Sequence, residues 1–95
     1  DALYNLSYVY FKSNDYTRAE NVVNKLFQIN PDDLDLYIAM TCIKYQQGQK
    51  DEALKVLEEG FKKGFKNIVG LEAESVLADF IQGKDYLDLK KRYAK

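Results

Sequence analysis

Two stretches of this 95-residue chain decide its fold, LYNLSYVY at positions 3–10 and YIAMTCIK at positions 37–44. They start at residues 3 and 37, an offset of 34, and each surrounds one small hydroxyl residue, Ser7 or Thr41, with large apolar side chains. The same offset recurs further along the chain, in the pairs Ala19-x3-Val23 and Ala53-x3-Leu57. Because similarity at a fixed spacing of this size is typical of repeat architectures, the chain is predicted to consist of repeated units.

Apolar residues recur along most of the chain at helical rather than alternating spacing, interrupted by Gly and by the single proline, Pro31. This pattern predicts helices near residues 1–13, 15–29, 33–47, 50–63, 68–82 and 85–94. The short links between them imply that consecutive helices run antiparallel. The small residues Ala19 and Ala53 predict a close crossing within each helix pair, where a larger or charged side chain would not fit.

The two copies match the signature of the tetratricopeptide repeat, an aromatic-x2-Leu-Gly-x2-Tyr stretch followed by Ala-x3-Phe and Pro. A weaker third copy lies 70 residues after the first, with Val76 on Leu6, Phe80 on Tyr10 and Asp85-Tyr86 on Asp15-Tyr16. The chain therefore resembles the tetratricopeptide repeat family over nearly its whole length. The resemblance implies an all-α fold, a right-handed solenoid of about three helix-turn-helix units. These form one domain, 1–95, with units of about 1–33, 34–69 and 70–95, the last degenerate and truncated.

The composition argues against several classes of function. With 14 Lys and Arg against 15 Asp and Glu, the net charge of -1 offers no general attraction for nucleic acid. The sequence has no His, no P-loop, no nucleotide-binding Gly triplet and no Cys pair at metal spacing, so we expect no enzyme activity, cofactor or metal. No apolar run approaches the roughly 20 residues of a membrane span. The single cysteine, Cys42, fits a reducing compartment, and we expect a cytoplasmic protein.

In tetratricopeptide arrays the first helix of each pair lines the concave face, and the resemblance carries this role onto nine positions. They are Tyr4, Tyr8 and Phe11 in the first unit, Ile38, Cys42 and Tyr45 in the second, and Glu74, Ala78 and Ile81 in the third. All except Glu74 are apolar or aromatic, and tyrosine hydroxyls can hydrogen-bond the backbone of a bound chain. We therefore expect the other eight to form a partner-binding groove for an apolar or amphipathic segment of another protein, in a scaffold or chaperone role.

The first helix leaves two explanations open. Its apolar residues sweep about 260° of the helix circumference, more than one partner helix can cover. Part of this surface lines a groove, or else a preceding helix covers it. In the second case the chain is an internal structural stretch of a longer helical-repeat protein. Association with like or unlike subunits is a further alternative.

Two narrower subclasses are distinguished by their groove residues. Tetratricopeptide co-chaperones that bind a C-terminal carboxylate use Lys, Arg and Asn side chains along the first helices of their units. Here Tyr4 and Tyr8 occupy the Lys and Asn positions of the first unit, so we do not expect this chain to bind such a terminus. The stretches ALYNLSY at 2–8 and NDYTRAE at 14–20 resemble the three-repeat chaperones of bacterial type III secretion. That resemblance implies a needle or translocator subunit as the client. The second unit, however, lacks at 37–42 the Gly-rich run that is common in the translocator chaperones.

Overall fold

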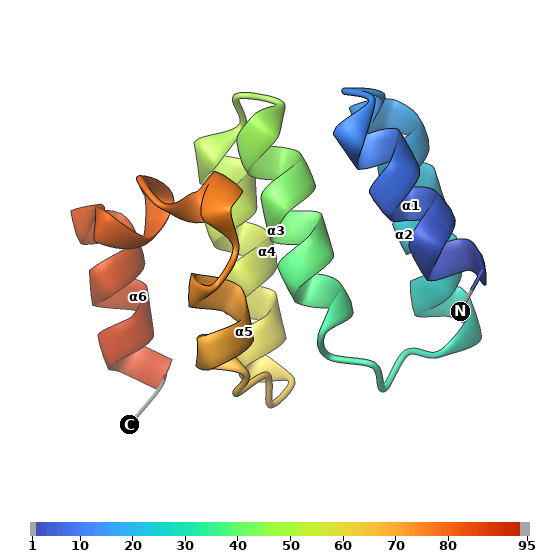
Figure 1. Ribbon diagram of the computed structural model, residues 1–95. Coiled ribbons are helices and arrows are strands. Elements are labelled where there is room, and N and C mark those ends of the chain that lie inside the picture. Colours follow the sequence, from blue (N-terminus) through green and yellow to red (C-terminus); the bar gives the residue numbers. More distant parts are fainter. Residues whose placement is uncertain (1, 94–95) are drawn as a thin grey trace.

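Helices make up most of the described part of the chain. The structure is a computed structural model that describes the backbone of residues 2–93 and the side chains of residues 5–93. Over these residues it contains helices and no strand. The elements are α1 (Ala2–Lys12), α2 (Tyr16–Ile29), α3 (Leu36–Gln46), α4 (Lys50–Lys62), α5 (Ile68–Glu72), the 3-10 turns η1 (Ser75–Leu77) and η2 (Phe80–Gln82), and α6 (Lys84–Tyr93) (Figure 1).

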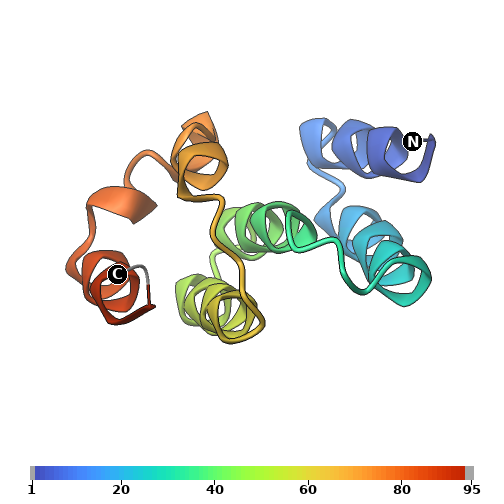
Figure 2. The ribbon, with the colours of Figure 1, turned by 90° about the horizontal axis from the view of Figure 1, so that it is seen from below.

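The helices form two layers. Figure 2 shows α1, α3 and α5 in one layer and α2, α4 and α6 in the other. The helix α1 packs on α2, and α3 packs on α4, as two hairpins that are joined where α2 packs on α3. The helix α6 packs on α4. The predicted all-α fold is therefore confirmed, with successive helix-turn-helix hairpins packed side by side.

The two hairpin turns share one backbone conformation at corresponding positions. Asn14 has φ 63° and Gly48 has φ 78°, and the two residues are separated by the same offset as the repeat. Gly and Asn adopt this left-handed conformation at the least cost, and it lets the chain reverse after a helix. Asp15 then caps α2, because its Oδ1 accepts a hydrogen bond from the N–H of Arg18 at 3.3 Å. The repeat therefore extends from the side chains to the backbone.

Several small residues of the two hairpins are buried. Ala19 in the first hairpin and Ala53 in the second are fully buried. Thr41 is fully buried as well, and its hydroxyl donates a hydrogen bond to the carbonyl oxygen of Tyr37 at 2.7 Å. Gly60 on α4 belongs to the same contact, since a Cβ there would lie 2.9 Å from Cγ of Tyr37. The burial of the two alanines agrees with the close crossings expected from them, and Gly60 marks a close approach of α4 to α3.

The continuous helix predicted over residues 68–82 is not observed, and this prediction is corrected. The helix α5 ends at Glu72, Glu74 is extended with φ -74° and ψ 114°, and two short 3-10 turns follow. In one continuous helix Leu71 and Phe80 would point about 180° apart. The break lets both side chains, together with Leu77, lie in the core. Burial of three large apolar side chains therefore outweighs helix continuity in this segment.

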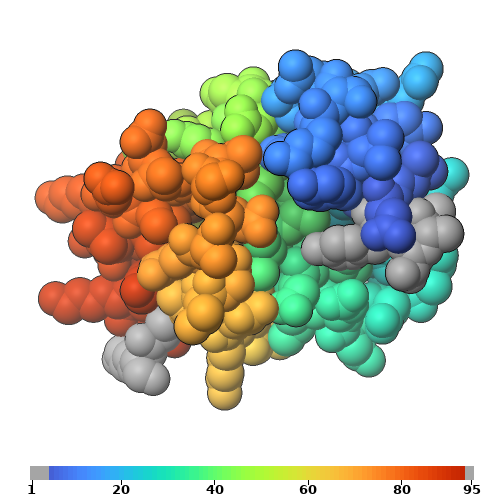
Figure 3. Space-filling view, viewed as in Figure 1, coloured from blue at the N-terminus to red at the C-terminus, as the bar shows by residue number. Residues whose placement is uncertain are grey.

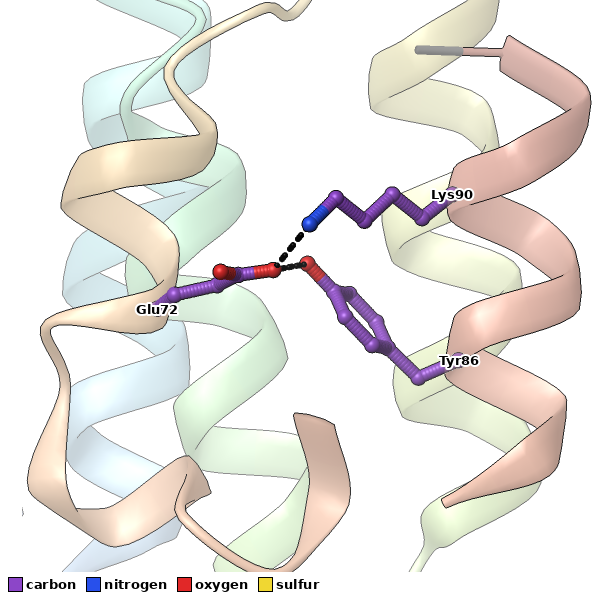
Figure 4. A network of polar contacts seen from close by, with 3 residues as sticks. All are labelled: Glu72, Tyr86 and Lys90. Carbon is purple, nitrogen blue, oxygen red and sulfur yellow. Dashed lines mark hydrogen bonds and ion pairs between the residues drawn. The ribbon is translucent and has the colours of Figure 1, made fainter. Parts of the chain in front are cut away.

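A polar network joins α5 directly to α6 (Figure 4). One carboxylate oxygen of Glu72, Oε2, accepts hydrogen bonds from the hydroxyl of Tyr86 at 2.7 Å and from Nζ of Lys90 at 2.8 Å. These two donors lower the pKa of the Glu72 carboxyl, the hydrogen bond from Lys90 contributing most. Burial and the bond to Glu72 raise the pKa of Tyr86. The network fixes the position of α5 against the last helix.

The Glu72 network predicts a specific dependence of stability on pH. Because the folded pKa lies below the usual value of 4.5, the stabilisation is present above about pH 4.5 and is lost as the pH falls through the folded value. We expect Glu72→Gln to lower the free energy of unfolding by about 0.5–1 kcal/mol near pH 7, and we expect this difference to be smaller at pH 3. Urea unfolding of the wild type and the variant at pH 7 and at pH 3 measures this difference in the free energy of unfolding. Glu59→Gln, at an exposed position, is the control, and an unchanged difference at the lower pH would contradict the assignment.

Candidate functional site

A small hollow opens between α1 and α3 on the layer formed by α1, α3 and α5. Its volume is about 60 Å³. The helix α1 contributes Ser7, Tyr8 and Phe11, and α3 contributes Ile38, Ala39, Cys42 and Ile43. Glu74, just beyond the end of α5, completes the lining. Figure 3 shows the surface of α3, in green, between the blue of α1 and the orange of the α5–η1 segment.

The repeat explains why these side chains meet. Residues 7, 8 and 11 share one face of α1 because they are spaced by three and four positions, and residues 38, 39, 42 and 43 share one face of α3 for the same reason. Tyr8 and Cys42 are equivalent residues in the two units, one offset of the repeat apart. The two hairpins are joined through the packing of α2 on α3, and the hollow opens between the equivalent faces of α1 and α3.

The α1 wall of the hollow is aromatic and partly open to solvent. The side chain of Tyr8 is 57% exposed. The Nζ of Lys12 lies 5.3 Å from the centroid of the Tyr8 ring, at cation–π distance. Phe11 is half-buried, and its ring meets that of Tyr16 edge to face at 5.6 Å. Tyr8 is therefore the wall residue with the most surface left to bury.

The α3 floor of the hollow is apolar and chemically inert. Ile38, Cys42 and Ile43 are buried. Burial, and secondly the negative charge of Glu74, raise the pKa of the Cys42 thiol to about 12. The thiol is therefore protonated at neutral pH, and a protonated thiol is a weak nucleophile. Cys42 contributes an apolar surface to this site.

The structure brings together four of the residues expected in the groove, Tyr8, Phe11, Ile38 and Cys42. The side chain of Tyr4 lies outside the described residues. Tyr45 and Ile81 pack against the core of the second hairpin, where the Tyr45 ring lies 5.2 Å from that of Phe80, and Ala78 is exposed. None of these last three lines the hollow. The break after Glu72 changes the direction in which Ala78 and Ile81 point, whereas Tyr45 on α3 packs on Phe80 instead.

Three lining residues, Ser7, Ala39 and Ile43, were absent from the expected set. Ser7 is buried and lines the hollow. Ala39 and Ile43 each follow an expected residue directly and share its helix face. The expected set took one position from each helical turn, whereas the face of a helix that lines a hollow includes adjacent positions as well.

Two larger hollows lie elsewhere on the surface. One of about 470 Å³ lies between α2, α3 and α4, and its rim carries both acidic and basic residues, such as Glu20, Lys44 and Glu59. Another of about 380 Å³ lies between α4 and α6 and is similarly mixed in charge. In the part of the chain that the structure describes, no three His, Cys, Asp or Glu residues are grouped to hold a metal ion. No described helix has the length and hydropathy needed to cross a membrane.

Comparison with known proteins identifies one family. The model of the tetratricopeptide repeat matches residues 10–73, more than half of the chain. The match runs from the last turn of α1 to the residue after α5, and so includes both hairpin turns and the whole of α3. No curated protein and no solved structure matches the chain significantly.

Proposed function

Because this chain belongs to the tetratricopeptide repeat family, we propose that it binds an apolar or amphipathic segment of a partner protein beside Tyr8, over the hollow between α1 and α3. Domains of this family are generally non-catalytic modules of protein–protein interaction. The observation that carries the proposal is an apolar hollow bordered by a largely exposed tyrosine. Exposed aromatic side chains next to a depression are typical anchors of protein interfaces.

The size of the hollow limits what it contributes to affinity. Full burial of one large apolar side chain contributes about 1.5–3 kcal/mol. A micromolar dissociation constant requires about 8 kcal/mol after the costs of association. One side chain inserted into about 60 Å³ does not supply this. The bound segment must therefore also cover the ring of Tyr8 and the neighbouring faces of α1 and α3, which favours an amphipathic helix laid along the groove.

A pair of neighbouring substitutions tests the proposal. Peptides are first selected on the wild-type protein from a displayed library of amphipathic helices, and their dissociation constants are measured by fluorescence anisotropy. Tyr8→Asp is expected to weaken binding by about 30-fold, because it removes an aromatic anchor worth about 2 kcal/mol. Val9→Asp is the matched control, since Val9 is 55% exposed on the same helix and does not line the hollow.

The control decides where the binding surface lies. We expect Val9→Asp to change the dissociation constant less than about threefold, and the circular-dichroism spectrum of both variants to stay helical. Equal losses of affinity in the two variants would show that the binding surface is not centred on the hollow. Unchanged binding by Tyr8→Asp, or the recovery of no peptide from the library, would refute the proposal.

A second candidate function is structural, and one observation favours it. Leu6 and Val9 on α1 are exposed, although both are apolar. If the chain is an internal stretch of a longer helical-repeat protein, a neighbouring helix covers these two side chains. In that case Val9→Asp lowers the stability of the longer protein, whereas Tyr8→Asp does not. The narrower hypothesis of a secretion chaperone stays a prediction.

A further inference from the structure

One charged side chain stands at the border of the apolar hollow. Glu74 is exposed and lies in the extended link between α5 and η1, immediately beside the hollow that it helps to line. Its backbone N–H donates a hydrogen bond to the carbonyl oxygen of Leu71, but among the described residues its carboxylate takes part in no hydrogen bond or ion pair. Its near neighbour Glu72 differs in this respect, since Tyr86 and Lys90 hold its carboxylate. Glu74 is therefore an acid with its charge available to a ligand.

The carboxylate of Glu74 acts on the hollow itself. Its negative charge is felt at the thiol of Cys42 on the floor, where it contributes to the raised pKa of that group. The basic side chain next to the opposite wall, Lys12, lies over the Tyr8 ring instead. The hollow therefore combines an apolar floor, an aromatic wall and one acidic border. Apolar surface around an ion pair lowers the local dielectric constant and strengthens the pair once a ligand excludes water.

We propose that the groove selects a basic amphipathic segment, in which a Lys or Arg lies one helical turn from the apolar residue that enters the hollow and pairs with Glu74. This inference rests on the proposed function and specifies the chemistry of the partner. One turn is the spacing at which two side chains of a helix share a face, and so at which one can fill the hollow while the other reaches its border. A guanidinium suits the site best, because it can bind a carboxylate with two parallel hydrogen bonds.

The test uses the displayed library of amphipathic helices, selected separately on the wild-type protein and on Glu74→Lys. On the wild-type protein we expect enrichment of Lys or Arg three or four residues from a Leu, Met, Ile or Phe. On Glu74→Lys we expect Asp or Glu at that position instead. Glu59→Lys makes the same change of charge at an exposed position on the rim of the hollow between α2, α3 and α4. We expect selection on this variant to yield the same peptide sequences as selection on the wild-type protein.

A charge exchange then measures the pairing directly. The best wild-type peptide is synthesised with Lys and with Glu at the enriched position. We expect Lys→Glu in the peptide to weaken binding to the wild-type protein by about tenfold, and Glu74→Lys in the protein to restore binding of the Glu peptide. The preference of the wild-type protein should shrink as the salt concentration rises, because salt screens a pair at the surface.

The outcomes separate the inference from the function on which it rests. Peptides that depend on Tyr8 but show no basic enrichment, or that respond equally to Glu59→Lys and Glu74→Lys, would overturn the inference and leave the proposed function standing. Peptides that do not depend on Tyr8, or no peptides at all, would overturn both. The chain itself carries such a pattern in Leu87 and Lys91 on α6. The protein could therefore self-associate in sedimentation velocity. If it does, and if Glu74→Lys abolishes this association, the site binds a second copy of the chain, and the inference of a different partner protein is overturned.

Discussion

Replacing Ala19 by Glu is expected to unfold most of the chain at 25 °C. Ala19 is fully buried in α2 and belongs to a cluster with Val23, Leu36 and Ile43, which joins the first hairpin to α3. A carboxylate at this point finds no basic partner in the cluster, and the larger side chain overfills a close helix crossing. The expected loss is about 4–5 kcal/mol, which is comparable to the whole stability of many small domains.

Circular dichroism at 222 nm and urea unfolding measure this loss. Asn21→Glu is the control, because Asn21 lies on the same helix at an exposed position and the substitution adds the same charge. We expect the control to stay within about 0.5 kcal/mol of the wild type. An Ala19→Glu protein with the urea midpoint of the wild type would show that the two helices do not cross closely at this residue.

Replacing Phe80 by Ala is expected to have the second-largest effect, a loss of about 3–5 kcal/mol. Phe80 is buried, and its ring lies 5.2 Å from that of Tyr45 and 5.6 Å from that of Tyr86. It therefore joins α3 and α6, which lie on opposite sides of η2 in the chain. Removing the ring leaves a cavity between α3 and α6, so repacking can recover only part of the loss.

Hydrogen exchange distinguishes a local effect of Phe80→Ala from a global one. We expect the amides of α6 to lose protection first, because this helix is held by η2, α4 and the Glu72 network. Val69→Ala is the control, since Val69 is 84% exposed, and it should change the stability by less than about 0.5 kcal/mol. Full protection of α6 in Phe80→Ala would contradict the place of this residue in the core.

The first two hairpins could be predicted closely because local signals and the repeat agree there. The small residues Ala19 and Ala53 mark the crossings, and Asn14 and Gly48 mark the turns. Each of these signals depends on neighbouring residues alone, and each occurs twice at one offset. Agreement between local preference and global fold is what makes a sequence easy to interpret.

The segment after residue 67 could not be predicted from spacing alone. Its apolar residues follow a pattern that also fits one continuous helix, and the helix ends where Leu71, Leu77 and Phe80 are all drawn into the core. The position at which the helix ends depends on the surface of α3 and α4 against which these side chains pack. The spacing of residues within the segment carries no information about that surface. The same break separates the expected site residues, because it leaves Glu74 beside the hollow and directs Ile81 to the core.

Methyl NMR gives the most direct test of binding in this groove. The five isoleucines of the chain are Ile29, Ile38, Ile43, Ile68 and Ile81, and two of them, Ile38 and Ile43, line the hollow. Ile29 is 69% exposed at the end of α2 and serves as an internal control for non-specific contact with the peptide. A protein labelled with carbon-13 at the isoleucine methyl groups is titrated with a selected amphipathic peptide. We predict saturable shifts at Ile38 and Ile43 and an unchanged signal at Ile29; shifts at Ile29 with none at Ile38 and Ile43 would contradict binding in the groove.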